Sequence, residues 1–142
     1  FKKLIQAYRE IGSEAGHADK DLKVGAHSWG WIAEDGEQAV KDYFHPTKQV
    51  VDAISKDRPH WQEMTYEQYL EQVGPNGAMF VGNPDQVAEK LIRMIEDLDL
   101  DRFMLHLPLG SMPHVQVLKA IELFGTQVAP KVRAYFAMKE GL

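Results

Sequence analysis

Hydrophobic and polar positions alternate along this chain with two different periods, and the periods separate helices from strands. Within residues 4–11, apolar side chains recur at helical spacing with charged residues between them. Residues 23–33 (KVGAHSWGWIA) and 102–107 (RFMLHL) are instead short runs of strand-forming residues, and the first is apolar at both odd and even positions. Such runs are typical of strands covered on both faces, as in a parallel sheet.

Local end signals place the other helices. Residues 34–37 (EDGE) open a second helix with acids in its first turn. Pro46 should cause a kink or a restart of this helix, because proline has no N–H to donate. Residues 83–86 (NPDQ) predict the start of a later helix, since Asn can cap, Pro suits the first helical position and Gln follows three residues after the cap. The last helix is expected to bury one apolar face, formed by Val117, Ile121, Phe124 and Val128.

The order of elements is α, β, α, a small insertion, α, β, α, and it predicts an α/β fold. The insertion covers residues 57–77, which are polar, and it holds one short helix beginning near Thr65. Single strands that alternate with helices imply parallel strands joined by crossovers. Two long strands are too few for a complete parallel sheet, and the chain starts inside a helical pattern. We therefore expect residues 1–142 to form a single domain that belongs to a longer protein.

The composition excludes several classes of protein. Hydrophobic residues make up 44% of the chain and the net charge is −5, with no basic stripe to meet a phosphate backbone, so nucleic acid is not an expected partner. No apolar run approaches the roughly 20 residues that a membrane span needs. The absence of Cys removes disulfides and thiolate ligands and agrees with a cytoplasmic location. Without a His-Glu-x-x-His motif or a carboxylate cluster, no metal site is expected.

Three stretches of the chain resemble the C-terminal third of luciferase-like flavin monooxygenases. They are residues 1–16, residues 24–39 (VGAHSWGWIAEDGEQA) and residues 80–133. The third is the most specific, because it combines the helix entry VGNPDQVAEKL with the ending IELFGTQVAPKVR. The resemblance covers nearly the whole chain.

The resemblance implies that the chain is the C-terminal portion of a TIM (β/α)₈ barrel. Members of the family bind FMN or a deazaflavin at the C-terminal ends of the barrel strands, where barrel enzymes keep their sites. Many of them use reduced flavin and O₂ to oxygenate an organic substrate, with a flavin reductase as a partner. Their main flavin-phosphate contacts come from central strands, which this chain does not contain. The isolated chain is therefore expected to hold no flavin, to be inactive, and to supply one wall of the pocket.

Candidate site residues lie on both predicted strands. His27 could donate a hydrogen bond to a flavin edge or move a proton, and the same catalytic roles are assigned to His106 on the second strand. Trp29 or Trp31 could lie against the flavin ring, and Ser28 is a further candidate for cofactor binding. The alternative for both histidines is ordinary packing in the barrel with a satisfied hydrogen bond.

The turn after the second strand gives further candidates. Gly110 and Ser111 open a helix and could offer free N–H groups to an anion of the cofactor, whereas the alternative is that Ser111 simply caps that helix beside Pro113. Met112 and His114 are expected to line the substrate pocket.

Three functions remain open at this point. The first is the C-terminal part of a flavin-dependent monooxygenase, and the second is a deazaflavin-dependent dehydrogenase on the same scaffold. The third is a non-catalytic module that self-associates. A partial barrel has open sheet edges, so a homo-oligomer is expected. The residues expected to face water in the monomer, or to lie beside unpaired backbone, are Val24, Ala26, Phe103 and Leu105. Alternatively, residues 57–77 could cover the gap with Trp61, Tyr66, Tyr69 and Leu70.

Overall fold

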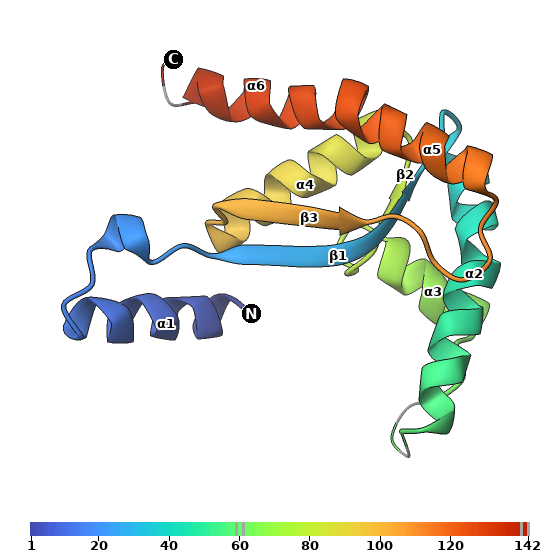
Figure 1. Cartoon of the computed structure of the whole chain (residues 1–142), viewed down its shortest axis with the longest axis horizontal. Coiled ribbons are helices and arrows are strands. Elements are labelled where there is room, and N and C mark those ends of the chain that lie inside the picture. The colour runs from blue at the N-terminus through green and yellow to red at the C-terminus, as the bar shows by residue number, and fades with distance from the viewer. Residues whose placement is uncertain (59, 61, 140, 142) are drawn as a thin grey trace.

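The computed structural model describes residues 1–58, 60, 62–139 and 141, and it has an α/β architecture (Figure 1). In chain order the elements are α1 (Lys2–Glu14), the 3₁₀ turn η1 (Asp19–Asp21), β1 (Gly25–Ile32), α2 (Gly36–Lys56), α3 (Tyr66–Val73), β2 (Phe80–Gly82), α4 (Pro84–Leu98), β3 (Arg102–His106), α5 (His114–Leu123), the π-helical segment η2 (Phe124–Val128) and α6 (Ala129–Lys139). No helix within the described residues is both long and apolar enough to cross a bilayer. Trp61 lies outside the described residues.

The three strands form one parallel sheet in the order β2–β1–β3. β1 pairs with β3 along residues 25–29 and with β2 along residues 30–32. The predicted parallel and adjacent arrangement of the two long strands is therefore confirmed. The short extended piece expected near residue 80 is a third strand of the same sheet.

Gly30 permits the close approach of these strands. A Cβ atom at this position would lie 2.4 Å from Leu105 Cδ1 and 2.5 Å from the Phe80 carbonyl oxygen. Any side chain would therefore push β3 or β2 away, which explains the glycine in the middle of an otherwise bulky strand.

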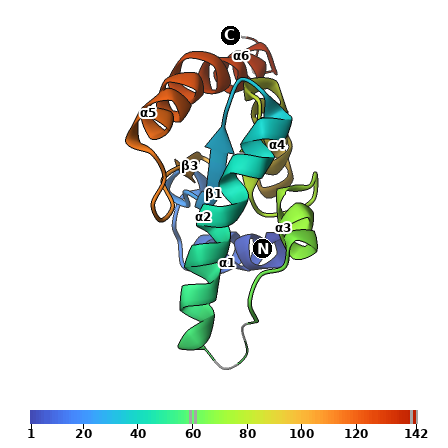
Figure 2. The same cartoon turned by 90° about the vertical axis from the view of Figure 1, so that its right-hand side faces the viewer.

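The two faces of the β1–β3 pair differ in what covers them. Phe103 and Leu105 pack against the core together with residues of α2, α4 and α5, because side chains alternate between faces along a strand. Figure 2 shows α4 and α3 on one side of β1. Phe103 and Leu105 therefore do not face water. They do stand on an edge strand of the described sheet, so the other half of the expectation, that they lie beside unpaired backbone, is confirmed. The water-facing positions of β3 are the alternate ones, of which Met104 is 54% exposed.

α2 runs from Gly36 to Lys56 without a restart at Pro46. Its buried residues recur every four positions on both sides of the proline, so packing keeps the chain helical across the one missing N–H. They are Ala39, Tyr43, Thr47 and Val51. In addition, the Thr47 hydroxyl donates to the Tyr43 carbonyl at 2.7 Å. The expected restart is therefore wrong.

The helix starts follow their sequence signals closely. At α4 the Asn83 side chain accepts from the Gln86 N–H at 3.0 Å, and the Gln86 side chain accepts from the Asn83 N–H at 2.8 Å, with Pro84 at the first helical position. Thr65 and Gln68 make the same reciprocal pair at α3. Both predicted helix starts are confirmed.

The buried face of the last helical stretch is the expected one at Val117, Phe124 and Val128, which face the core. Ile121 is exposed instead, and Ala120 and Leu123 are buried. The π-helical segment η2 between α5 and α6 adds residues to one turn, so a single helical period cannot describe both halves.

Candidate functional site

The uncovered face of the sheet brings together candidate residues from both long strands. In the β1–β3 register, His27 lies opposite Met104 and Trp29 lies opposite His106. Directly paired residues project from the same face, and neighbouring strands lie about 4.8 Å apart. We call these four residues, His27, Trp29, Met104 and His106, the sheet-face cluster.

The histidines of the sheet-face cluster are exposed, and Trp29 is half-buried against the core. Neither histidine is packed in the core of the described chain. The alternative, packing inside a complete barrel, is not tested by this chain and stays open. The cluster combines two imidazoles, an indole and a thioether, without a carboxylate. Such a surface can stack on a planar ring and can donate or accept a proton at the imidazole nitrogens.

Ser28 is not brought to this cluster. It lies on the opposite face, and its hydroxyl donates to the Ala78 carbonyl just before β2. Trp31 is also inaccessible to a ligand, because it is only 2% exposed. Its ring stacks on Tyr43 of α2, with ring centroids 5.8 Å apart. Trp31 is therefore a core residue, and the hypothesis that it lies against a flavin ring is wrong.

The Trp31–Tyr43 stack marks where α2 closes the C-terminal end of β1. Burial, with a smaller contribution from Tyr69, raises the pKa of the Tyr43 hydroxyl well above its usual value, and the backbone of Gly30 offsets only part of this effect. Trp31 Nε1 has no hydrogen-bond partner among the described residues. Trp31 and Tyr43 therefore contribute packing next to the cluster, and the Tyr43 phenol stays neutral.

The loop after β3 carries the other candidates to the same end of the sheet. Buried Leu107 and Leu109 anchor it, and Gly110 takes a left-handed conformation with φ +52°, beside Gln49 of α2. The structure places the remaining loop candidates as follows: Ser111 exposed, Met112 half-buried against the core, and His114 exposed as the first residue of α5.

α5 begins without a side-chain cap. Its N-cap residue is Pro113, so the alternative in which Ser111 caps the helix is wrong. Within the residues that the structure describes, no group of three or more His, Asp or Glu is arranged to hold a metal ion.

A sizeable apolar cavity meets this cluster only at His27 and otherwise extends away from it. It measures about 660 Å³ and runs between α1, the C-terminal end of α4 and the first half of β1. Consecutive residues 23–28 line it, which means that it follows the edge of the strand instead of one face. Its walls are mostly apolar, with Leu4 and Tyr8 from α1 and Met94 from α4. We call this cavity the edge slot.

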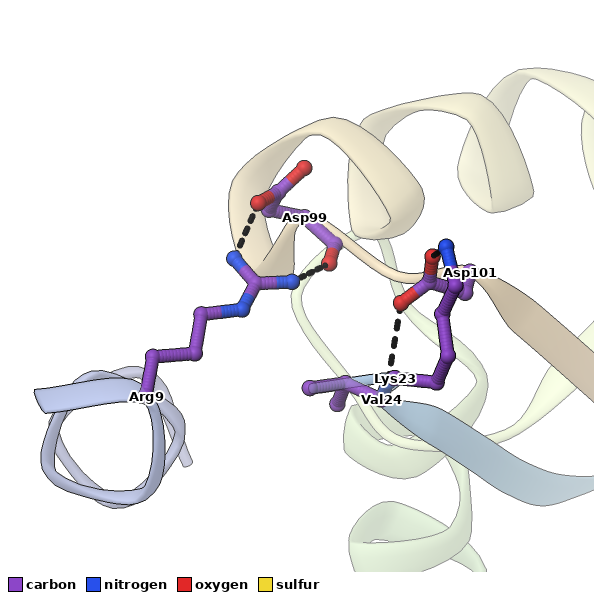
Figure 3. Close-up of polar contacts among 5 residues, drawn as sticks. All are labelled: Arg9, Lys23, Val24, Asp99 and Asp101. Atoms are coloured by element: carbon purple, nitrogen blue, oxygen red, sulfur yellow. Dashed lines mark hydrogen bonds and ion pairs between the residues drawn. The ribbon is translucent and has the colours of Figure 1, made fainter. Parts of the chain in front are cut away.

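Two ion pairs fasten the surroundings of the edge slot to the turn between α4 and β3 (Figure 3). Arg9 of α1 binds the Asp99 carboxylate and donates to the Asp99 carbonyl at 2.7 Å. Lys23 lies 2.7 Å from Asp101, whose other oxygen accepts from the Val24 N–H at 2.8 Å. The hydrogen bond from Lys23, and to a lesser extent that from the Val24 N–H, holds the pKa of the Asp101 carboxyl below its usual range.

Sequence reasoning missed Met104, although a signal existed. Met104 stands two residues before His106 on the same strand, so period-two alternation alone would have placed both on one face.

Solved structures match this arrangement, whereas no protein-family model and no curated protein matches the chain. Monooxygenase RslO1 from Streptomyces bottropensis matches with a TM-score of 0.68 and 20% identity, over 91% of this chain and 37% of that one. EDTA monooxygenase (EmoA) from Chelativorans sp. BNC1 matches with a TM-score of 0.61 and 17% identity, over 94% and 39%. The oxygenating constituent of 3,6-diketocamphane monooxygenase from Pseudomonas putida, solved with FMN, matches with a TM-score of 0.61 and 20% identity, over 92% and 39%.

At these identities the similarity establishes the fold. The resemblance predicted from the sequence is confirmed at that level, and the chain has the architecture of a portion of a (β/α)₈ barrel. The chain spans less than two fifths of the length of each of these relatives.

The different surroundings of Ser28 and the two histidines predict different effects on stability. Ser28→Ala removes the hydrogen bond to Ala78 and should lower the free energy of unfolding by about 1 kcal/mol. His27→Ala and His106→Ala remove exposed side chains and should change it by less than about 0.5 kcal/mol. Urea denaturation of the three variants measures this. A loss of several kcal/mol in either histidine variant would mean that the histidine is structural.

Proposed function

We propose that this chain is the C-terminal part of a flavin-dependent, luciferase-like monooxygenase that oxidises an organic substrate with reduced flavin and O₂. The observation that carries the proposal is the sheet-face cluster, exposed on parallel strands of a barrel-like fold. The likeness in fold to solved monooxygenases, one of them in complex with FMN, supports it. In barrel enzymes the site lies at the C-terminal ends of the strands, where His106 and the loop after β3 are found.

The cluster fits the ring of a flavin better than its phosphate. Trp29 and Met104 offer an apolar surface for a planar ring, and His27 and His106 offer hydrogen bonds to its polar edge. Among the described residues, these two strands carry no group of basic side chains at their C-terminal ends. Gly110 and Ser111, before the uncapped start of α5, supply at most part of an anion contact.

Each residue then has a specific task in the reaction. When bound, reduced flavin would supply the two electrons needed for one oxygen atom of O₂ to enter the substrate while the other is released as water. His27 and His106 hold or move a proton at an imidazole nitrogen next to the reacting atoms. Met112 and His114 line the substrate side of the pocket, and α2 helps to exclude water from the end of the sheet. A flavin reductase would supply the reduced cofactor.

The open edge of β1 fits the idea of a larger barrel. β2 pairs with this edge only along residues 30–32, and the edge slot occupies the rest. A further strand lying in the edge slot would cover its apolar walls and pair the exposed backbone groups. We propose that the complete protein supplies that strand, along with the phosphate contacts.

The proposed role of the histidines can be tested in the protein that contains this chain and binds flavin. His27→Gln and His106→Gln should each lower kcat by about 100-fold with little change in flavin affinity, because a positioned general acid or base contributes roughly that factor. His17→Gln, an exposed histidine outside the sheet, is the matched control. An unaltered kcat for substrate oxygenation in both histidine variants would contradict the assignment of these residues. Turnover with a deazaflavin in the absence of O₂ would instead favour the alternative function, a deazaflavin-dependent dehydrogenase.

The 142-residue chain alone is expected to bind FMN weakly. Each missing charge-assisted hydrogen bond to the phosphate forfeits roughly 1.5–3 kcal/mol of binding free energy. Isothermal calorimetry with FMN should give no submicromolar affinity. A submicromolar Kd would show that this chain carries a phosphate anchor of its own.

We also propose that the isolated chain forms homo-oligomers through the edge slot, since a second copy can cover its apolar walls. Light scattering at high protein concentration should report a dimer or a larger species. Ala26→Lys places a charge in the edge slot and should restore the monomer, whereas the exposed Lys41→Ala should not. A monomeric wild-type chain at the same concentration would overturn this proposal.

A further inference from the structure

Lys90 is a buried lysine whose partners are backbone carbonyls. Its side chain is 9% exposed, and its Nζ donates to the carbonyls of Gly74 at 2.6 Å, Met79 at 2.7 Å and Val73 at 3.3 Å. Nζ also lies 5.2 Å from the centroid of the Phe80 ring. Among the described residues, no carboxylate lies within salt-bridge distance of it.

The three acceptors belong to one tight segment of the chain. Val73 is the last residue of α3, Gly74 is its C-cap, and Met79 immediately precedes β2. The segment folds back on itself, because the Gly77 N–H donates to the Gly74 carbonyl at 3.0 Å and the Met79 N–H donates to the Gln72 carbonyl at 2.9 Å. Its carbonyl oxygens converge on one point, at the negative end of a helix.

Convergent carbonyls of this kind are well suited to a positive charge. Three oxygens that face one another in a buried place repel, and each loses its water. The ammonium ion of Lys90 has three donors, which matches the number of acceptors, and an aromatic face adds a cation–π contact. Burial, with the nearby positive charge of Arg93, lowers the pKa of Lys90 to about 8, so the side chain still carries its proton at neutral pH.

We propose that residues 73–79 with Phe80 form a binding site for a primary ammonium ion, which Lys90 fills from within the fold. We call it the carbonyl cradle. When Lys90 fills it, the carbonyl cradle holds the segment between α3 and β2 against the sheet. This proposal does not depend on the flavin chemistry proposed above.

The carbonyl cradle acts on the sheet through residues 78 and 79. Lys90 holds the Met79 carbonyl from the α4 side, while Ser28 of β1 holds the neighbouring Ala78 carbonyl. β2 starts at the next residue and pairs with β1 just beyond Trp29. The ammonium ion thus sets where β2 meets β1.

Chemical rescue tests the proposal in the 142-residue chain at neutral pH. Lys90→Ala empties the carbonyl cradle and leaves a channel for n-propylammonium, which has the three carbons and the nitrogen that the substitution removes. Amide hydrogen exchange within residues 72–82 should become ~10- to 100-fold faster in this variant, the factor expected for the loss of a buried charge-assisted hydrogen bond. Adding n-propylammonium chloride should reverse most of that acceleration, and sodium chloride at equal ionic strength should not.

Two controls separate the charge from simple packing. Lys90→Met keeps most of the aliphatic volume without the charge, so it should show the fast exchange and no rescue. Lys41→Ala, at an exposed lysine on α2, should respond to neither salt. If Lys90→Ala does not fold, recovery of its helical circular dichroism with n-propylammonium counts as rescue, because a ligand of the native state promotes folding. Wild-type exchange in Lys90→Met, or no response of Lys90→Ala to n-propylammonium beyond that to sodium chloride, would overturn the proposal.

Discussion

The parallel pairing of β1 with β3 is the constraint on which the rest of this structure depends. It fixes the register in which Trp29 lies opposite His106, and strand alternation then decides which side chains meet the helices. Phe103 and Leu105 supply the core contacts of one face, and Gly30 lets the backbones come close. The opposite face keeps its imidazoles exposed, so one pairing produces both the core and the candidate site.

Much of the fold was predictable because its signals are local. The capping residues 83–86 act within one turn of helix, and the two long strands show as runs of strand-forming residues, although only one face of them is covered in this chain. The restart expected at Pro46 failed for the opposite reason: the buried residues that keep α2 helical on both sides of the proline pack against the core, and sequence does not display those contacts. The role of Lys90 was also not predictable, because all of its hydrogen-bond acceptors are backbone carbonyls, and any residue type can supply these.

The candidate site was predictable in its residue types and less so in its geometry. His27 and His106 stood out as imidazoles on strands, but only the register shows that they share an exposed face. Ser28 adjoins His27 in sequence and projects from the other face, which period-two alternation already implies. Trp31 has the same parity as Trp29, and it is lost to the site only because α2 crosses the end of the strand and stacks Tyr43 on it.

The central claim is that the sheet-face cluster is the surface that meets the flavin ring. Nuclear Overhauser contacts between FMN and the protein that contains this chain test it most directly, with methyl-labelled methionine as the reporter. The account predicts contacts from the ring protons of FMN to the Met104 methyl group and to the indole of Trp29. Contacts from the flavin ring to edge-slot residues such as Leu4 and Tyr8, with none to Met104, would contradict it.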